Sequence, residues 1–294
     1  LLAVKAVSLD YEGCGIEMEA GRPGWNDAMN GLPGLFGSST CETAEALRLA
    51  RWLLDTLPQM PDTVFPEEAA ALLDAVADDL KKEYDWDRSA TIRETFRQRI
   101  YNNNSDKTRL ISGHSIRDLL KAAAARFERG VNESIDPNTG LLHTYYFHKP
   151  IAAVQTDSEH VNIDSFQARP LPLFLEGQVH WLRVCDSQQA RKVYQTLRRS
   201  RLLDPQLQMY KLNECLAECS PEIGRARTFS RGWFENESIW LHMSYKYLLE
   251  LLKQGLYEKF YADAQTMLVP FMDPTVYGRS ILENSSFIAS SVCP

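Results

Sequence analysis

Apolar residues recur at helical spacing along most of the chain, after a glycine-rich stretch over residues 1–38. Ser39-Thr40-Cys41-Glu42 has the pattern of a capping box, and Pro66 suits the first position of a helix. The spacing predicts helices at about 39–57, 66–84, 87–101, 115–127, 173–184, 187–200, 206–219, 238–253 and 258–267.

The pattern changes between residues 136 and 172. The segment DPNTG (136–140) is typical of a turn, and HTYYFH (143–148) has the β-branched and aromatic content of a strand. Elsewhere short loops join the helices in pairs. The sequence therefore predicts an all-α fold of helical hairpins with a short strand-bearing insertion around 136–172. Such hairpins build an (α/α)6 barrel or a helical solenoid, and the chain has material for part of a barrel.

Composition narrows the class of protein. Of the 294 residues 44% are hydrophobic and 24% charged, which is an ordinary globular balance. Lys and Arg number 32 against 39 Asp and Glu, a net charge of −7, so the broad basic surface of a nucleic-acid-binding protein is not expected. No apolar run approaches the roughly 18 residues of a membrane span, so we expect a soluble chain that does not bind membranes, in the cytoplasm.

The cysteines and the chain ends add two expectations. The 6 cysteines are too scattered for a disulfide framework, and Cys215 and Cys219 lack the second pair that a zinc site needs, so no metal is predicted. The chain begins at Leu1 and ends in SSFIASSVCP (285–294), with neither a signal peptide nor a polar tail. We expect one catalytic domain over 1–294 that is a segment of a longer protein.

The loop segment GWNDAMN (24–30) has the residue types that a sugar site uses. Trp25 offers a flat apolar face to a sugar ring, Asn26 can bond to hydroxyls, and the carboxyl group of Asp27 can protonate a glycosidic oxygen. From the local pattern alone a second interpretation stays open, in which Asp27 is an Asx-turn residue and Trp25 fills a core.

GWNDAMN resembles the DWNDGMN motif of the inverting β-glucoside phosphorylases, the family of the cellobiose and chitobiose phosphorylases. The resemblance implies an (α/α)6 barrel with Asp27 as the general acid and with Trp25, Asn26 and Asn30 at the sugar. Gly24 stands where the family has Asp, and Ala28 where it has Gly. The longer stretch GRPGWNDAMNGLPGLFGSS is more similar to the β-1,3-glucan phosphorylases.

A second segment, SRGWFENESIWLHMSYK (230–246), resembles the family pattern PxGxKENGGIFxHxxxW. Glu235 and Asn236 fall on its Glu-Asn and His242 on its His. The resemblance implies that Glu235 and Asn236 bind the sugar and that His242 helps to hold phosphate. Alternatives remain open: Glu235 as an acid at a helix N-terminus, and His242 as a core histidine.

Arg225 and Arg227, just upstream of this segment, are the candidate cationic partners of phosphate. In the segment 164–181, Arg169 is a weaker candidate, because it can pair with Glu176 instead. The family has a Gly- and Ser/Thr-rich phosphate loop after its last helices. Residues 278–294 do not match it, so we expect that loop beyond the end of this sequence.

The resemblance implies phosphorolysis of β-linked gluco-oligosaccharides, β-1,3-glucan in the first place, to α-glucose 1-phosphate with inversion. Asp27 would protonate the leaving oxygen while phosphate attacks from the opposite face, with Glu17, Glu19 and Glu235 as acids that could help it to keep its proton. Phosphate is then a co-substrate, no other cofactor is needed, and a homodimer is a further expectation. Two alternatives are an inverting hydrolase with Glu235 as base, and a carbohydrate-binding protein without turnover.

Overall fold

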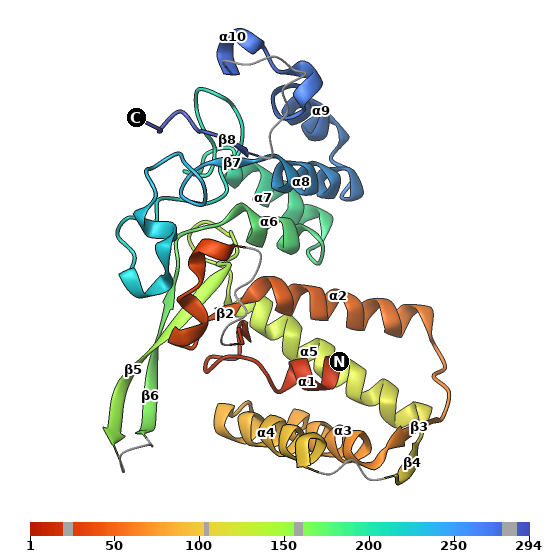
Figure 1. Ribbon diagram of the computed structural model, residues 1–294. Helices are drawn as coiled ribbons and strands as arrows, with labels where there is room; N and C mark the ends of the chain where they lie inside the picture. Colours follow the sequence, from red (N-terminus) through yellow and green to blue (C-terminus); the bar gives the residue numbers. More distant parts are fainter. Residues whose placement is uncertain (20–25, 103–105, 156–160, 278–286) are drawn as a thin grey trace. The chain divides into compact units, whose positions relative to one another are not determined.

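The computed structural model describes residues 1–19, 26–102, 106–155, 161–277 and 287–294 (Figure 1). The chain divides into two compact units. The first unit comprises Leu1–Glu17, Ser38–Ser134 and His148–Ala168. The second unit comprises Met18–Gly37, Ile135–Phe147 and Arg169–Pro294.

The first unit is built around a long amphipathic helix, α5. Its buried residues Leu120, Ala123, Phe127 and Val131 follow helical spacing and form the stripe on which α1, α2 and α3 pack. The helices of this unit are α1 (Leu2–Ala6), α2 (Thr40–Thr56), α3 (Glu67–Leu80), α4 (Trp86–Asn102) and α5 (Gly113–Glu133). An antiparallel pair, β3 (Thr63–Pro66) and β4 (Thr108–Ile111), accompanies them.

A four-stranded sheet corrects the predicted fold class. It has the order β1-β2-β5-β6. Its strands are β1 (Ile16–Glu17), β2 (Ser38–Ser39), β5 (Tyr145–Gln155) and β6 (Val161–Pro170). Of the part of the chain that the structure describes, about 52% is helical and 15% is strand, so the all-α (α/α)6 prediction is wrong and the fold is mixed α and β.

The sheet forms because the strand predicted near 143–148 continues to Gln155 and returns over β6. Phe166 on β6 is buried, with its ring 5.1 Å from that of Tyr11 and 5.5 Å from that of Trp86. This contact between distant segments gives the returning strand an apolar anchor that helical spacing does not reveal.

The second unit carries short helices joined by structured turns. Its α-helices are α6 (Leu175–Leu182), α7 (Ser187–Leu197), α8 (Leu241–Lys253), α9 (Tyr257–Met267) and α10 (Pro274–Tyr277). Its 3-10 helices are η1 (Asp27–Met29), η2 (Leu32–Leu35), η3 (Pro221–Ile223), η4 (Arg225–Thr228) and η5 (Val269–Phe271). Two short strands, β7 (Ile239–Trp240) and β8 (Phe287–Ile288), pair antiparallel.

Most predicted helices are confirmed within a few residues, but 206–219 is not helical. Asp204 instead caps a turn through the backbone N–H groups of Gln206 and Leu207, and Asn213 pairs with Phe174 as an isolated bridge. The predicted capping box at Ser39 is also wrong, because the Ser39 side chain makes no capping hydrogen bond. Among the described residues, no helix has both the length and the apolar character needed to cross a membrane.

A buried ion-pair network holds the helices of the first unit together. Asp79 on α3 is 1% exposed and accepts hydrogen bonds from Arg126 on α5 (2.6 Å) and Arg88 on α4 (2.5 Å). Burial alone raises the pKa of Asp79, but the two guanidinium groups outweigh it and the net pKa is lowered. The charged network therefore stabilises this unit above the ordinary pKa of an aspartate, and its contribution is lost as the pH falls through the lowered value.

Asp79→Asn is expected to lower the free energy of unfolding by about 3 kcal/mol, because it leaves the buried Arg126 guanidinium without its counter-charge. Urea denaturation at neutral pH measures the loss, and the difference from wild type should narrow in acid. The neighbouring Asp78→Asn is the matched control, since Asp78 is exposed and its ion pair with Lys81 lies at the surface. Equal effects of the two substitutions would contradict the assignment.

Candidate functional site

The backbone of residues 26–31 lies directly against residues 222–225 of the second unit. A Cβ added at Gly31 would lie 1.9 Å from the carbonyl oxygen of Glu222. A Cβ added at Gly224, where φ is +121°, would lie 2.5 Å from the carbonyl oxygen of Ala28. The N–H of Gly31 donates to the carbonyl oxygen of Ile223 at 3.1 Å. Only glycine permits this approach, and it fixes the loop that carries Asn26 and Asp27.

Apolar side chains from both segments close a core beneath the loop. Ala28, Met29 and Leu32 point inward from η1 and η2, and they pack with Ile223 and Ala226 of η3 and η4. Further members of the core are Tyr145, Phe147, Leu171, Phe174 and Leu216. Asp27, at the start of η1, and Asn30, directly after its end, are exposed at the surface, while the two residues between them are buried.

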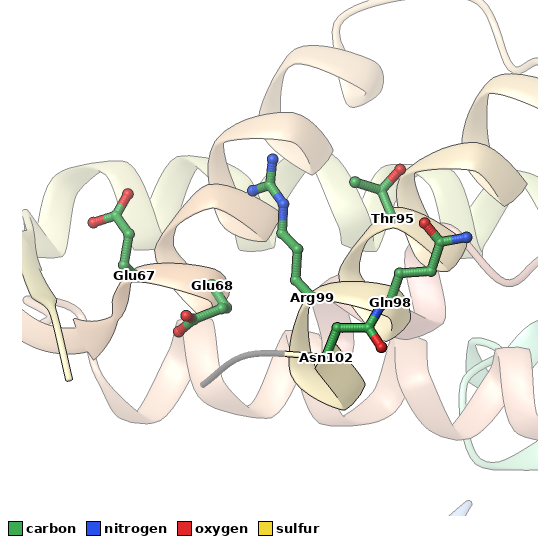
Figure 2. A pocket seen from close by; sticks show the side chains of 6 residues that line it. All are labelled: Glu67, Glu68, Thr95, Gln98, Arg99 and Asn102. Carbon is green, nitrogen blue, oxygen red and sulfur yellow. The ribbon is translucent and has the colours of Figure 1, made fainter. Parts of the chain in front are cut away.

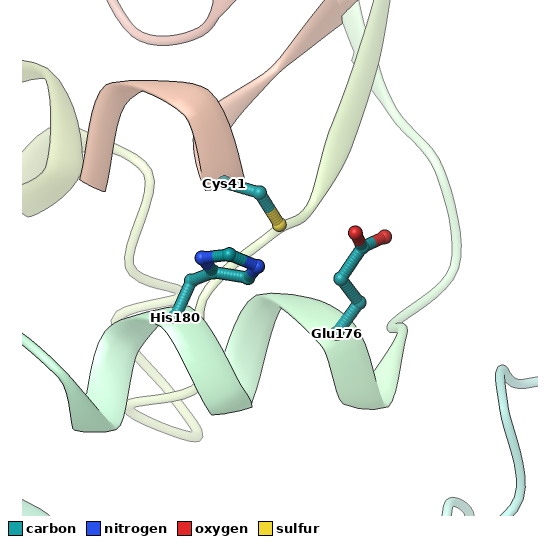
Figure 3. A group of neighbouring side chains, drawn as sticks. All are labelled: Cys41, Glu176 and His180. Carbon is teal, nitrogen blue, oxygen red and sulfur yellow. The ribbon is translucent and has the colours of Figure 1, made fainter. Parts of the chain in front are cut away.

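Asn26 is the buried polar residue of the loop, with 2% of its surface exposed. Its Nδ2 donates to the Tyr145 hydroxyl at 3.0 Å, and that hydroxyl donates to a carboxylate oxygen of Glu176 at 2.5 Å. Glu176 projects from the start of α6, one turn before His180 on the same helix (Figure 3). Within the part of the chain that the structure describes, the Oδ1 atom of Asn26 is buried and has no hydrogen-bond partner. An orphaned acceptor of this kind suits a ligand that brings a hydroxyl or amide donor.

Glu235 joins the two motifs, which lie more than 200 residues apart in sequence. Its side chain is 8% exposed, and its Oε2 accepts the backbone N–H of Ala28 at 2.8 Å. Burial, the largest cause, and the Asp27 carboxylate both raise the pKa of Glu235. The Ala28 N–H and the Arg225 guanidinium lower it, and the net result is a raised pKa. Asp27, Glu235 and Arg225 are therefore electrostatic neighbours.

The segment around Glu235 is held by amide side chains that the sequence did not single out for this role. Asn213 accepts the N–H of Glu237 at 2.7 Å and donates to the carbonyl oxygen of Glu235 at 2.7 Å. Asn236 is fully buried, accepts the N–H of Leu216 at 3.1 Å and donates to the carbonyl oxygen of Phe229 at 2.9 Å. Both amides thus position backbone beneath the site.

The other predicted residues have different environments. Arg225 is exposed on η4, whereas Arg227 is half-buried. Burial raises the pKa of Cys219 to about 11, although the charge of Arg227 acts in the opposite direction. His242 is half-buried on α8 beside Trp240, with ring centroids 5.6 Å apart. Burial lowers the pKa of His242 and Lys246 lowers it further, which favours the neutral imidazole. Trp25 lies outside the described residues.

The structure also describes the surroundings of the expected acidic residues and of Arg169. Asp27 influences Glu235 electrostatically. Of the other two acids expected near Asp27, Glu17 on β1 of the first unit pairs with Arg93 at 2.6 Å, and Glu19 is exposed. Arg169 lies over the ring of Phe147, 5.7 Å from its centroid.

Tyr145, Glu176 and Asn213 are site residues that sequence reasoning missed or placed in another role. Tyr145 stands within a predicted strand and Asn213 within a predicted helix, where nothing in the local pattern marks a contact with a distant loop. Glu176 was predicted as an ion-pair partner of Arg169, but in the structure it accepts the hydrogen bond of the Tyr145 hydroxyl.

A pocket of about 420 Å³ lies elsewhere, in the first unit (Figure 2). Its walls come from the start of α3 and from α4, namely Glu67, Glu68, Thr95, Gln98, Arg99 and Asn102. None of the residues that the motifs single out lines this pocket.

Comparison of the chain with protein-family models finds no match, and comparison with curated proteins finds none either. The assignment of a function to the site therefore depends on its motifs and on its geometry.

Gly31→Ala is expected to lower the free energy of unfolding by about 2 kcal/mol, because the new methyl group overlaps the Glu222 carbonyl and forces the two segments apart. Urea denaturation followed by tryptophan fluorescence measures the change. Gly34→Ala in the same loop is the matched control, since, its chain neighbours aside, no heavy atom of the described residues lies within 4 Å of a Cβ there. The close packing of the loop would be disproved if both variants unfolded alike.

Glu235→Ala is expected to cost about 2 kcal/mol, because it leaves the Ala28 N–H unsatisfied, whereas Glu235→Gln keeps an acceptor oxygen. The raised pKa of Glu235 means that the contribution of this one side chain to stability is full below the ordinary pKa of a glutamate and is lost as the pH rises through the raised value. The difference in unfolding free energy between wild type and the Gln variant should therefore shift in favour of the Gln variant as the pH rises from 4 to 8. Equal stability of the Ala and Gln variants would refute the anchoring role.

Proposed function

We propose that the chain is an inverting glycoside phosphorylase that cleaves β-linked gluco-oligosaccharides, β-1,3-glucan in the first place, and forms α-glucose 1-phosphate. The observation that carries this proposal is the hydrogen bond between Glu235 and the N–H of Ala28. It joins the two segments that separately resemble that family, so residues assigned to one reaction meet in one place.

Asp27 is the proposed general acid. It is exposed at the first position of η1, while the backbone on either side of it is fixed by Asn26, Ala28 and Gly31. A carboxyl group on a fixed backbone but open to solvent can meet a glycosidic oxygen without a loop movement. It would give its proton to the departing sugar oxygen as the anomeric carbon–oxygen bond breaks.

Phosphate would attack the anomeric carbon from the opposite face, with Arg225 supplying positive charge. Arg225 is exposed on η4 and within electrostatic reach of Glu235. Arg227 and His242 are the further phosphate candidates. Burial and Lys246 lower the pKa of His242, so a neutral imidazole would contribute a hydrogen bond and the arginines would carry the permanent charge.

Asn26 is the proposed contact for a hydroxyl of the sugar. Its Nδ2 is held by Tyr145, and its buried Oδ1 is left to accept a donor from a ligand. Asn30 is exposed one turn further along the loop and is a second polar candidate, while Asn236 contributes by holding backbone.

The geometry around Glu235 favours phosphorolysis over the inverting-hydrolase alternative. A hydrolase needs a base that activates water. Glu235 is 8% exposed, and one carboxylate oxygen is engaged by the Ala28 N–H, so it is better suited to anchor the loop than to hold a water molecule. Phosphate needs no such base, because it is already anionic.

Asp27→Asn is expected to lower the rate of phosphorolysis of a β-1,3-gluco-oligosaccharide about a thousandfold, because the leaving oxygen loses its proton donor. On an aryl β-glucoside whose phenol leaves as a stable anion, the loss should be far smaller. Release of glucose 1-phosphate is followed in both assays.

Asp273→Asn serves as the control, since Asp273 is also exposed and bonds only to Thr275 among the described contacts. An Asp27→Asn variant as active as wild type would refute the general acid. Equal losses on both kinds of substrate would assign Asp27 to binding rather than to proton transfer.

A further inference from the structure

Aromatic side chains gather at the surface beside the segment that holds Glu235. Trp233 is 40% exposed and Phe234 is 42% exposed. The ring of Phe287 lies 5.2 Å from that of Trp233 and 5.3 Å from that of Phe234, and Trp240 adjoins Phe287 at 6.0 Å. These four residues are called the aromatic surface below.

The β7–β8 pair aligns part of this surface. Trp240 and Phe287 are directly opposite each other in the strand register, and both strands are labelled side by side in Figure 1. The planes of Trp240 and Phe287 differ by 29°, and those of Phe234 and Phe287 by 30°. Phe287 is thus stacked against Phe234 and against Trp240, and Trp233 stands edge-on to both Phe234 and Phe287.

The loop that presents the rings is held in an unfavourable backbone conformation. Phe234 has φ of +46° and Glu237 has φ of +64°, which are left-handed values for residues with a Cβ. The Phe234 carbonyl oxygen accepts bonds from the Ser238 hydroxyl and from Trp240 Nε1, the latter at 3.0 Å.

Buried charges and the chain end brace the same loop. Glu237 pairs with Lys211 at 2.7 Å and with Arg231 at 2.5 Å. Gly232, with φ of +81°, lies so close to Cys293 that a Cβ there would be 2.5 Å from the Cys293 nitrogen, and its carbonyl oxygen accepts the N–H of Ser290 at 3.1 Å. The fold therefore fixes exposed aromatic rings from several sides, where burial would have been the usual outcome for them.

We propose that the aromatic surface binds the oligosaccharide chain of the substrate away from the cleaved bond, by stacking of its rings on the apolar faces of successive sugars. The identity of that chain as a β-linked glucan rests on the function proposed above. A sugar chain alternates apolar ring faces with hydroxyl edges, which suits the exposed rings of Trp233 and Phe234 bordered by a polar group such as Arg231.

The continuity of the surface with the Asp27 loop favours this occupant over a protein partner. Phe234 precedes Glu235 in sequence, and the Glu235 carboxylate reaches the N–H of Ala28, next to Asp27. Residues 233–235 thus present rings to solvent and a carboxylate to the loop of the proposed acid. A chain lying on these rings would therefore contact the same short segment that holds the loop of the proton donor.

The test is a binding titration of a β-1,3-linked gluco-oligosaccharide without phosphate, in the Asp27→Asn background, so that no turnover occurs. Trp233→Ala should weaken binding about tenfold, whereas Trp233→Tyr, which keeps a ring, should retain most of it. Phe271→Ala is the matched control, since Phe271 is 62% exposed in the same unit. Urea midpoints of each variant verify that the fold is kept.

The result separates this proposal from the function on which it rests. If Trp233→Ala weakens glucan binding but wild type makes no glucose 1-phosphate, the proposed binding by the aromatic surface is supported and the proposed phosphorylase activity is refuted. If phosphorolysis occurs and Trp233→Ala leaves affinity unchanged, the surface proposal is overturned alone. It is also overturned if wild type binds an α-1,4-linked chain equally well, or if Trp233→Ala dissociates a dimer in light scattering while glucan affinity stays the same.

Discussion

A single buried carboxylate determines where the proposed acid can be. Glu235 accepts the N–H of Ala28 from the far end of the sequence, and this bond, with the glycine contact between Gly31 and Glu222, fixes the loop on which Asp27 is exposed. The two roles differ in environment: Asp27 faces solvent, while Glu235 is removed from it. The Asp27 charge also raises the pKa of Glu235, so the anchor and the acid are electrostatically coupled.

Much of the second unit is backbone outside regular helices and strands, and the buried polar groups of such backbone are satisfied by side chains. Asn213 and Asn236 do this beneath the Glu235 segment, and the Tyr145–Glu176 pair does it beside Asn26. The segment 233–237 consequently has two faces. Its carboxylates and amides turn inward to hold the site, and its rings turn outward.

Regular helices could be predicted from the sequence because their signal is local. The apolar stripes of α2, α3, α5, α8 and α9 repeat within each helix, and the structure confirms them. The helix predicted at 206–219 was wrong, because Asp204 and Asn213 commit their side chains to backbone groups there. The all-α class was wrong for a similar reason: β6 is anchored by Phe166 against two rings distant in sequence. Within the site, motif resemblance pointed to Asp27 and Glu235, but the role of Tyr145 depends on a contact that spans 119 positions.

The most direct test of the account is the identity of the product and its dependence on phosphate. Wild-type protein is incubated with a β-1,3-gluco-oligosaccharide, with and without inorganic phosphate, and proton NMR follows the anomeric signals from the first minutes. The account predicts α-glucose 1-phosphate only when phosphate is present. Free glucose released equally without phosphate, or no product in either sample, would contradict it.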